Sequence, residues 1–423
     1  MYNYLQHEKT LRPLIEQAEE KVADIHRKIE RIIEENQYKV LRSFQKHQVA
    51  EFHFTPSTGY GYNDLGRETL EKIYADVFGG EAALVRQQIV SGTHAISIAL
   101  FGVLRPGDEL LYITGKPYDT LEEVVGIRGN GSGSLKEFGI SYNAVPLMEN
   151  GKVDFEAVSQ AMKPNTKVIG IQRSKGYDDR PSFTIKEIEE MIRFVKEIDP
   201  KVIVFVDNCY GEFVETLEPC NIGADLMAGS LIKNPGGGLV KSGGYIIGKE
   251  ELVEACSYRM TSPGLGVESG ASLYTLLEMY QGFFLAPHVT GQAVKGAVFT
   301  SALLELIGLQ TTPKWDDFRT DLIQAVQFSN ADMMTEFCQA IQAASPVDSH
   351  VTPFPSEMPG YNDQVIMAAG AFIQGASIEL SADGPIRPPY SAYVQGGLTY
   401  AHVKIAIASA VDRLIEKGLI KLN

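Results

Sequence analysis

The alternation of apolar strands with amphipathic helices over residues 84–248 is the sequence feature that most constrains the fold. Apolar runs of strand length occur near 84–90, 109–114, 139–146, 167–173, 202–208, 225–230 and 243–248. Helical patterns lie near 93–104, 119–127, 153–163 and 184–197. Strands separated by helices form mainly parallel sheets, because a parallel connection needs a crossover. We therefore expect an α/β fold whose mainly parallel seven-stranded sheet carries helices on both faces.

The segments on either side of this region have a different pattern. Residues 9–36 carry apolar side chains at three- and four-residue steps, which predicts one amphipathic helix that packs on the body of the protein or on a second subunit. Further helices are expected near 68–78, 270–281, 287–308, 315–344 and 400–417, and strands near 364–380. We therefore expect an N-terminal helical arm (1–56), a large domain (57–285) and a smaller α+β C-terminal domain (286–423).

Charge and composition argue against several classes of partner. The chain of 423 residues has 38 basic and 53 acidic residues, and the net charge of −15 argues against nucleic acid or an anionic membrane as the main partner. Residues 1–9 are polar and no apolar run approaches ~18 residues, so we expect a soluble, cytoplasmic protein without a signal peptide or membrane span. The four cysteines form no Cys-x-x-Cys pair, so neither a metal site nor disulfides are expected.

Lys233 is the first candidate for chemistry. It follows the apolar run that ends at Ser230 and precedes Asn-Pro-Gly-Gly-Gly238, where glycines let a bulky ligand approach the backbone. A desolvated lysine in such a turn can become nucleophilic and form a Schiff base with pyridoxal phosphate (PLP). The alternative is a surface lysine on a glycine loop, which is the commoner case on spacing alone. A nucleotide loop is disfavoured, because Val240 stands where the phosphate-loop pattern needs glycine.

A phosphate site is predicted at Ser91-Gly92-Thr93, which follows a strand and opens a helix. Free N–H groups and the positive end of the helix dipole meet at such a turn, and Gly92 leaves room for the phosphate. Ser230 is a candidate for a further hydroxyl contact. Simple helix capping by Ser91 and Thr93 is the alternative.

Asp207 is the candidate partner of the cofactor's ring nitrogen. It ends the apolar run Val202-Ile-Val-Phe-Val, and a buried carboxylate needs a cation such as a pyridinium nitrogen. Taken alone, an aspartate in this position is more often a helix cap or a metal ligand. Its place 26 residues before Lys233 (233 − 207 = 26), with one strand between them, favours the cofactor.

Three tyrosines are candidates for contacts with the cofactor. Tyr118 lies just beyond a strand, at the sheet edge that carries Gly92, and offers a face on which the ring can stack. Tyr60 and Tyr62 stand in a loop of glycine and tyrosine and could reach the phosphate. The alternative for all three is a tyrosine that fills a gap in the packing.

Substrate recognition needs a cation for an amino acid's carboxylate. Arg387 stands between Ile386 and two prolines, near Tyr393, and an arginine held in this way loses little entropy on making a bidentate contact. Arg173, at the end of the 167–173 strand, is a second candidate, for the substrate or for the cofactor's ring oxygen. The alternative for both is a surface charge.

Together these motifs are similar to those of a known enzyme group. The order Ser91-Gly92-Thr93, Asp207 and Ser230-x-x-Lys233 resembles the fold-type I PLP enzymes of the cystathionine lyase and methionine γ-lyase group. Four segments look like the bacterial aluminium-resistance or cystathionine β-lyase-like proteins, and the likeness covers nearly the whole chain. They are Thr58-Gly-Tyr-Gly-Tyr-Asn-Asp-Leu-Gly-Arg67, Gln88-Ile-Val-Ser-Gly-Thr-His-Ala95, Gln172-Arg-Ser-Lys-Gly-Tyr177 and Gln395-Gly-Gly-Leu-Thr-Tyr400.

The resemblance implies a homodimer or homotetramer with active sites between subunits, in which Tyr60 or Tyr62 serves a neighbour's phosphate site. It implies a carbon-sulfur lyase, in which Lys233 removes the α-proton of an amino acid while Asp207 keeps the ring protonated, and a sulfur group leaves from the β or γ carbon. An aminotransferase and a PLP-binding regulator without turnover are the alternatives. Three departures leave the substrate open: His94 after Thr93, Gln172-Arg173-Ser174 in place of an asparagine-containing segment, and the glycines after Lys233.

Overall fold

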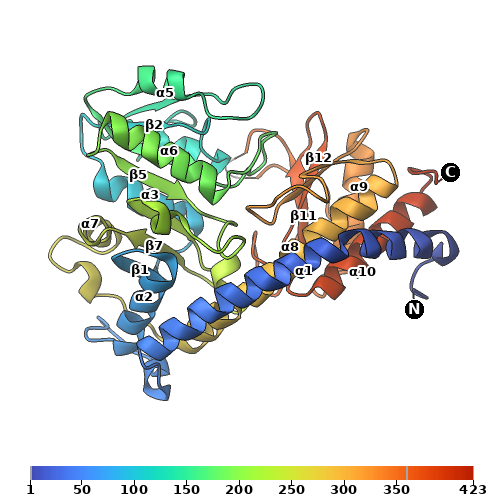
Figure 1. Cartoon of the computed structure of the whole chain (residues 1–423), viewed down its shortest axis with the longest axis horizontal. Helices are drawn as coiled ribbons and strands as arrows, with labels where there is room; N and C mark the ends of the chain where they lie inside the picture. The colour runs from blue at the N-terminus through green and yellow to red at the C-terminus, as the bar shows by residue number, and fades with distance from the viewer. Residues whose placement is uncertain (1, 359–360, 423) are drawn as a thin grey trace.

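Two β-sheets organise the chain in this computed structural model, which describes residues 2–358 and 361–422 (Figure 1). The larger sheet has seven strands in the order β1-β7-β6-β5-β4-β2-β3. These are β1 (Ala82–Arg86), β2 (Glu109–Tyr112), β3 (Ser141–Ala144), β4 (Thr166–Gln172), β5 (Ile203–Asp207), β6 (Leu226–Ser230) and β7 (Gly244–Gly248). Neighbouring strands are parallel from β3 to β6, whereas β7 runs antiparallel to both β6 and β1. The predicted mainly parallel sheet is confirmed.

Helices cover both faces of this sheet, because successive side chains of a strand point to opposite faces. Leu110 packs in a buried cluster with α3 (Gly92–Val103) and α7 (Glu250–Met260). Its neighbour Leu111 packs in another cluster, with α2 (Leu65–Phe78) and α6 (Ile185–Ile198). Two short helices, α4 (Glu122–Val125) and α5 (Phe155–Ala161), lie in the connections. The predicted helices on both faces are confirmed.

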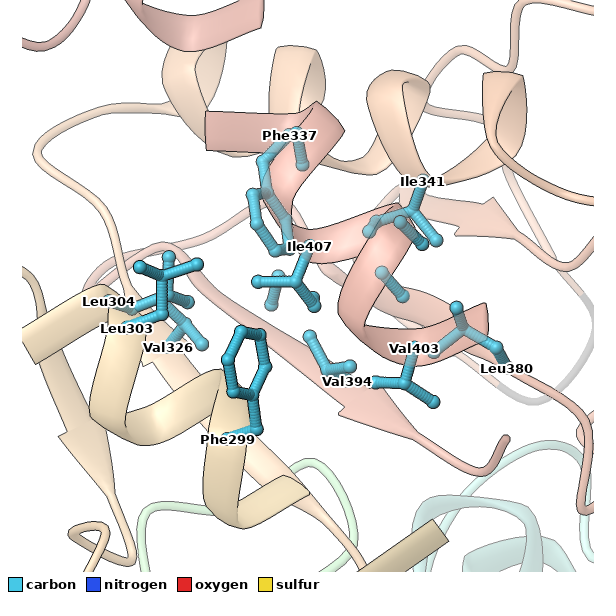
Figure 2. Close-up of a cluster of buried hydrophobic side chains, with 14 of the residues drawn as sticks. Phe299, Leu303, Leu304, Val326, Phe337, Ile341, Leu380, Val394, Val403 and Ile407 are labelled. Atoms are coloured by element: carbon cyan, nitrogen blue, oxygen red, sulfur yellow. The ribbon is translucent and has the colours of Figure 1, made fainter. Parts of the chain in front are cut away.

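The smaller sheet is antiparallel, with strand order β10-β11-β12-β9-β8. Its strands are β8 (Gln310–Thr312), β9 (Gln324–Gln327), β10 (Val365–Ala368), β11 (Ser381–Pro385) and β12 (Ser391–Gln395), and it packs with α9 (Ala331–Ala343) and α10 (Tyr400–Glu416). Figure 2 shows side chains from these helices and strands, among them Phe337, Val394 and Ile407, pointing into one core. The predicted small α+β part is confirmed.

Two long helices, α1 (Glu8–Lys46) and α8 (Leu276–Leu306), lie side by side along the molecule (Figure 1). A ring nitrogen of His26 lies 3.2 Å from the carbonyl oxygen of Lys295, and Gly291 leaves the space that Ile33 occupies. The N-terminal helix is therefore longer than predicted and packs on the body of its own chain.

The helices predicted near 270–281 and 287–308 are one continuous helix, α8, although Pro287 lies inside it. Burial of most of its residues favours an unbroken helix, because tertiary packing outweighs the hydrogen bond that proline removes. The predicted domain boundary at residue 286 falls within α8, and the division into three domains stays a prediction.

The helix predicted over 315–344 is wrong in its first half. Residues 324–327 form β9 and pair with β12, and α9 begins only after Asn330, whose side chain accepts a hydrogen bond from the Met333 amide at 2.9 Å. The strand predicted near 364–380 is reduced to β10, and the sequence analysis missed β11 and β12. Their residues include Asp383 and Gln395, polar side chains that satisfy each other in the folded protein.

Candidate active site

A cavity of about 250 Å³ lies at the edge of the large sheet where the parallel strands end. Strands β4, β5 and β6 end at Gln172, Asp207 and Ser230, and each of these residues lines the cavity. The small sheet closes the other side with Met367 of β10 and Gln395 of β12. Ligands of α/β proteins collect at this edge of the sheet. The cavity is therefore the candidate active site.

The structure brings most of the predicted site residues to this cavity. Those that line it are Ser91, Gly92, Thr93, Tyr118, Asp207, Ser230, Lys233 and Tyr393. They come from segments 302 residues apart in the chain (393 − 91 = 302), so the fold alone brings them together.

Lys233 and Asp207 form the charged centre of the cavity. Nζ of Lys233 lies 4.0 Å from the centre of the Tyr210 ring, and the backbone amide of Cys209 donates to Oδ1 of Asp207 at 3.2 Å. Burial raises the pKa of Asp207, and the positive charge of Lys233 opposes that rise. The charges of these two side chains therefore influence each other within one cavity.

The pKa of Lys233 is shifted in opposite directions by burial and by the neighbouring groups. Burial by itself lowers this pKa, but the surrounding groups raise it above the usual lysine value. The acidic groups that raise it are Cys209, Tyr210, Asp207 and Glu212. The free protein therefore holds Lys233 protonated, and Lys233 must lose this proton before it can act as a nucleophile.

The anion-binding end of the cavity is the start of α3. Ser91 caps this helix by accepting a hydrogen bond from the His94 amide at 3.0 Å, and the amides of the first helical turn have no carbonyl partner within the helix. A Cβ atom added to Gly92 would lie 3.2 Å from Sγ of Cys209 and 3.3 Å from Cβ of Ser230. Ser91 therefore caps the helix, and the same turn also offers free backbone amides that could bind an anion. The two interpretations of this motif do not exclude each other.

Gln172, at the end of β4, has an unsatisfied polar atom beside the cavity. Its side-chain nitrogen donates to the Ser174 carbonyl oxygen at 2.8 Å, but its buried Oε1 has no hydrogen-bond partner within residues 2–358 and 361–422. A buried polar atom without a partner is costly unless a ligand supplies one. A cofactor or substrate that donates a hydrogen bond to Oε1 of Gln172 would therefore be favoured in this cavity.

Tyrosines form most of the aromatic wall. The hydroxyl oxygens of Tyr118 and Tyr361 lie 2.8 Å apart, and the Tyr177 ring is tilted against the rings of Tyr118, Tyr361 and Tyr393. Tyr210 has a φ of 70°, a conformation rare for a bulky residue, and its hydroxyl donates to the Ala376 carbonyl oxygen at 3.3 Å. This wall joins the large part of the chain to the small part.

The sequence analysis missed several residues of this wall, among them Cys209, Tyr210, Tyr361 and Gln395. It also missed Asp383 of β11, a buried carboxyl that accepts hydrogen bonds from Gln395 at 2.9 Å and from Ser381 at 3.2 Å. Burial raises the pKa of Asp383 to about 6. A signal for Cys209 and Tyr210 existed, because they stand two and three residues after Asp207, at the end of a buried strand.

Four predicted residues lie elsewhere. Tyr60 and Tyr62 stack on each other, are 71% and 50% exposed, and do not line the cavity of their own chain. Arg387 pairs with Asp363 at 2.8 Å in a neighbouring cavity of about 160 Å³, which shares Tyr393 with the main one. The fourth residue is Arg173.

Arg173 points into the protein interior and is fully buried. Its guanidinium donates to Asn208 at 2.8 Å and pairs with Glu215 at 3.2 Å and Glu218 at 3.3 Å. These contacts leave it outside the cavity. The placement corrects the expectation that Arg173 faces the cofactor or the substrate, because two carboxylates, Glu215 and the fully buried Glu218, hold it in the interior.

The residues of the cavity fit PLP. The open turn at Gly92 suits a phosphate, Asp207 suits a protonated ring nitrogen, Lys233 suits the aldehyde, and Oε1 of Gln172 awaits a polar partner. Over the described residues, no group of three or more metal-binding side chains is found. Within the same residues, no helix has both the length and the hydropathy that a membrane crossing requires.

Comparison with known proteins identifies the family. The family model of methionine gamma-lyase matches residues 11–415. YnbB of Bacillus subtilis (strain 168) is 70% identical over 421 residues, which cover 99% of this chain and 100% of YnbB. A Bacillus cereus protein of known structure is 70% identical with a TM-score of 0.93, and covers 95% of this chain and 99% of its own.

A second solved structure, a carbon-sulfur lyase involved in aluminum resistance from Clostridium novyi NT, is 49% identical with a TM-score of 0.92 and covers 96% of each chain. The PLP-dependent protein YhfS from Escherichia coli, at 17% identity and a TM-score of 0.59 over 90% of this chain and 96% of its own, shares the fold alone. The match of the family model over almost the whole chain is decisive: the chain belongs to the methionine gamma-lyase family.

Proposed function

We propose that the chain is a PLP-dependent carbon-sulfur lyase that acts on a sulfur-containing amino acid by β- or γ-elimination. The observation that carries the proposal is that Lys233, Asp207 and the open N-terminus of α3 face one cavity. An amine, a carboxylate and an anion site in one cavity are what a phosphorylated pyridine aldehyde requires.

Each part of the cofactor has a candidate partner in this chain. Ser91, Gly92, Thr93 and Ser230 would hold the phosphate, and Tyr118 would stack on the ring. Tyr60 and Tyr62, whose exposed rings stay free in one chain, would reach the phosphate site of a neighbour in a cytoplasmic assembly of two or four copies.

PLP, when bound, withdraws electrons from the α carbon of an attached amino acid. Asp207 would keep a positive charge at the ring nitrogen, and that charge would in turn balance the charge of Asp207. Nζ of Lys233 could then take the α-proton and return a proton to the leaving sulfur. Apolar side chains of the cavity wall, including Ile96, Ile232 and Met367, would keep water away from these proton transfers.

Substrate orientation would depend on the side of the cavity formed by the small sheet. Arg387 is the candidate for the substrate's α-carboxylate, because it lies beside the cavity and shares Tyr393 with it. Its ion pair with the half-buried Asp363 would have to open when the substrate binds.

One panel of substrates tests the proposal. The PLP-loaded protein is incubated with cystathionine, cysteine and methionine, and thiol and keto acid are assayed. Release of both from one substrate supports a lyase. A requirement for an added keto acid, without thiol, indicates an aminotransferase instead. Binding of PLP without any product indicates a regulator.

A further inference from the structure

Lys175 is a buried cation with almost no partner. It is 2% exposed, and its Nζ reaches only the Thr312 carbonyl oxygen, at 3.5 Å, the limit of a hydrogen bond. No ion pair of Lys175 is found within the described residues. The nearby carboxylate of Asp321 instead accepts hydrogen bonds from Ser174 and Ser182. An ammonium buried in this way is costly unless an anion joins it.

A large polar cavity opens beside Lys175. It has a volume of about 640 Å³, lies between the segment after β4 and the strands β8 and β9, and is lined by Lys175, Asp178 and Tyr393 among others. Tyr393 also lines the active-site cavity, and a small hollow lined by Lys175, Tyr118 and Tyr177 shares residues with both cavities. A ligand that fills the active site could therefore extend its far end toward Lys175.

The charged side chains of this second cavity determine which chemical group at the far end of a ligand could bind there. Glu305 is occupied, because it accepts hydrogen bonds from Thr311 at 2.6 Å and Ser301 at 3.0 Å. Asp178, which is half-buried, and Asp179, which is exposed, line the cavity with Lys175. A doubly charged phosphate would be repelled by Asp178, whereas a single carboxylate suits Lys175, and an ammonium beside that carboxylate suits Asp178.

We propose that Lys175 binds a carboxylate at the far end of the substrate's side chain. This inference rests on the proposed function and narrows its substrate: the group attached to sulfur ends in a carboxylate, as in an amino-acid end, and is not a simple alkyl group. The position of Lys175 between the two cavities makes it a specificity-determining residue.

Two ligands without sulfur test the proposal on the PLP-loaded protein. L-2-aminopimelate and L-2-aminoheptanoate differ only in a carboxylate or a methyl group at the far end, and titration calorimetry measures the Kd of each. The wild type should bind the dicarboxylate about tenfold more tightly, the effect of one charge-assisted hydrogen bond. Lys175→Met should remove this preference, and Lys175→Arg should retain most of it.

Lys314 provides the matched control, because it lines the same cavity but is exposed. Lys314→Met should keep the preference within about twofold of the wild type, since exposed charges contribute little. Equal affinities of the wild type for the two ligands, or an unchanged preference in Lys175→Met, would overturn the proposal. Because the ligands cannot lose sulfur, these outcomes stand apart from a failure of the lyase assay. If PLP does not bind, the same titrations on the PLP-free protein report on Lys175.

Discussion

The hydroxyl groups of Tyr118 and Tyr361 lie 2.8 Å apart and connect the segment after β2 to the segment before β10 across the candidate active site. Tyr118 is held from its other side by the chain at Gly176, where an added Cβ would lie 2.8 Å from the tyrosine ring. The cavity is therefore closed by a contact that neither sheet provides alone.

This contact predicts coupling between Tyr118 and Tyr361. Each of Tyr118→Phe and Tyr361→Phe should lower the free energy of unfolding by about 1 kcal/mol, because one hydroxyl loses its partner. The double variant should lower the free energy of unfolding by about as much as either single variant, because the same hydrogen bond is lost in all three. Urea unfolding of the four proteins measures the cycle. Strict additivity of the two effects would show that the hydroxyl groups do not interact.

Lys233→Ala should abolish the visible absorbance that PLP gives on binding and reduce any lyase rate by more than about 10³-fold, because the same amine holds the cofactor and moves the proton. An absorbance spectrum after addition of PLP, followed by the thiol assay, measures both effects. Lys241→Ala is the control, because Lys241 is 73% exposed and pairs with Glu278 outside the cavity. An unchanged spectrum in Lys233→Ala would refute the assignment.

Asp207→Asn should retain PLP but lower the rate by about 10²-fold, because an amide cannot hold a positive charge at the ring nitrogen. Glu212→Gln is the matched control. Burial raises the pKa of Glu212 to about 8, so this carboxyl is already neutral at pH 7 and the change removes no charge. Single-turnover rates of the two variants measure the difference, and equal rates would exclude Asp207 as the partner of the ring.

Asp383 predicts a pH dependence of stability. Burial raises its pKa from the ordinary 3.8 to about 6, so the folded protein holds this proton more tightly than the unfolded chain. The protonated Asp383 therefore stabilises the folded protein fully below pH 4. As the pH rises to 6, the free energy of unfolding should fall by about 3 kcal/mol. Asp383→Asn should remove this loss. Urea unfolding at pH 4, 5, 6 and 7 measures it, and parallel curves for the two proteins would contradict the prediction.

Gly92→Ala should weaken PLP binding by about tenfold while the protein still folds. The added methyl group would meet Cys209 and Ser230 at 3.2 Å and 3.3 Å and push apart the segments that form the proposed phosphate site. Fluorescence titration with PLP measures the affinity, and the thermal melting curve checks the fold. An unchanged affinity for PLP would show that the phosphate does not bind at the N-terminus of α3.

The sequence by itself determined the large sheet and the centre of the candidate site. Strand and helix periodicity report which side chains are buried, so the seven strands and their helices could be predicted. Lys233, Asp207 and Gly92 could be predicted because each follows a buried strand, and strand ends share one edge of a parallel sheet.

Only the tertiary structure determined which polar side chains are buried and which partners they have. Arg173 and Lys175 stand two residues apart in one motif, yet Glu215 and Glu218 pair with the first, and the second lies almost unpaired beside a cavity. Asp383 is buried in β11, where its polar neighbours gave no strand pattern. Periodicity reports the burial of apolar side chains, whereas a buried polar side chain depends on partners that are distant in the sequence and become neighbours only on folding.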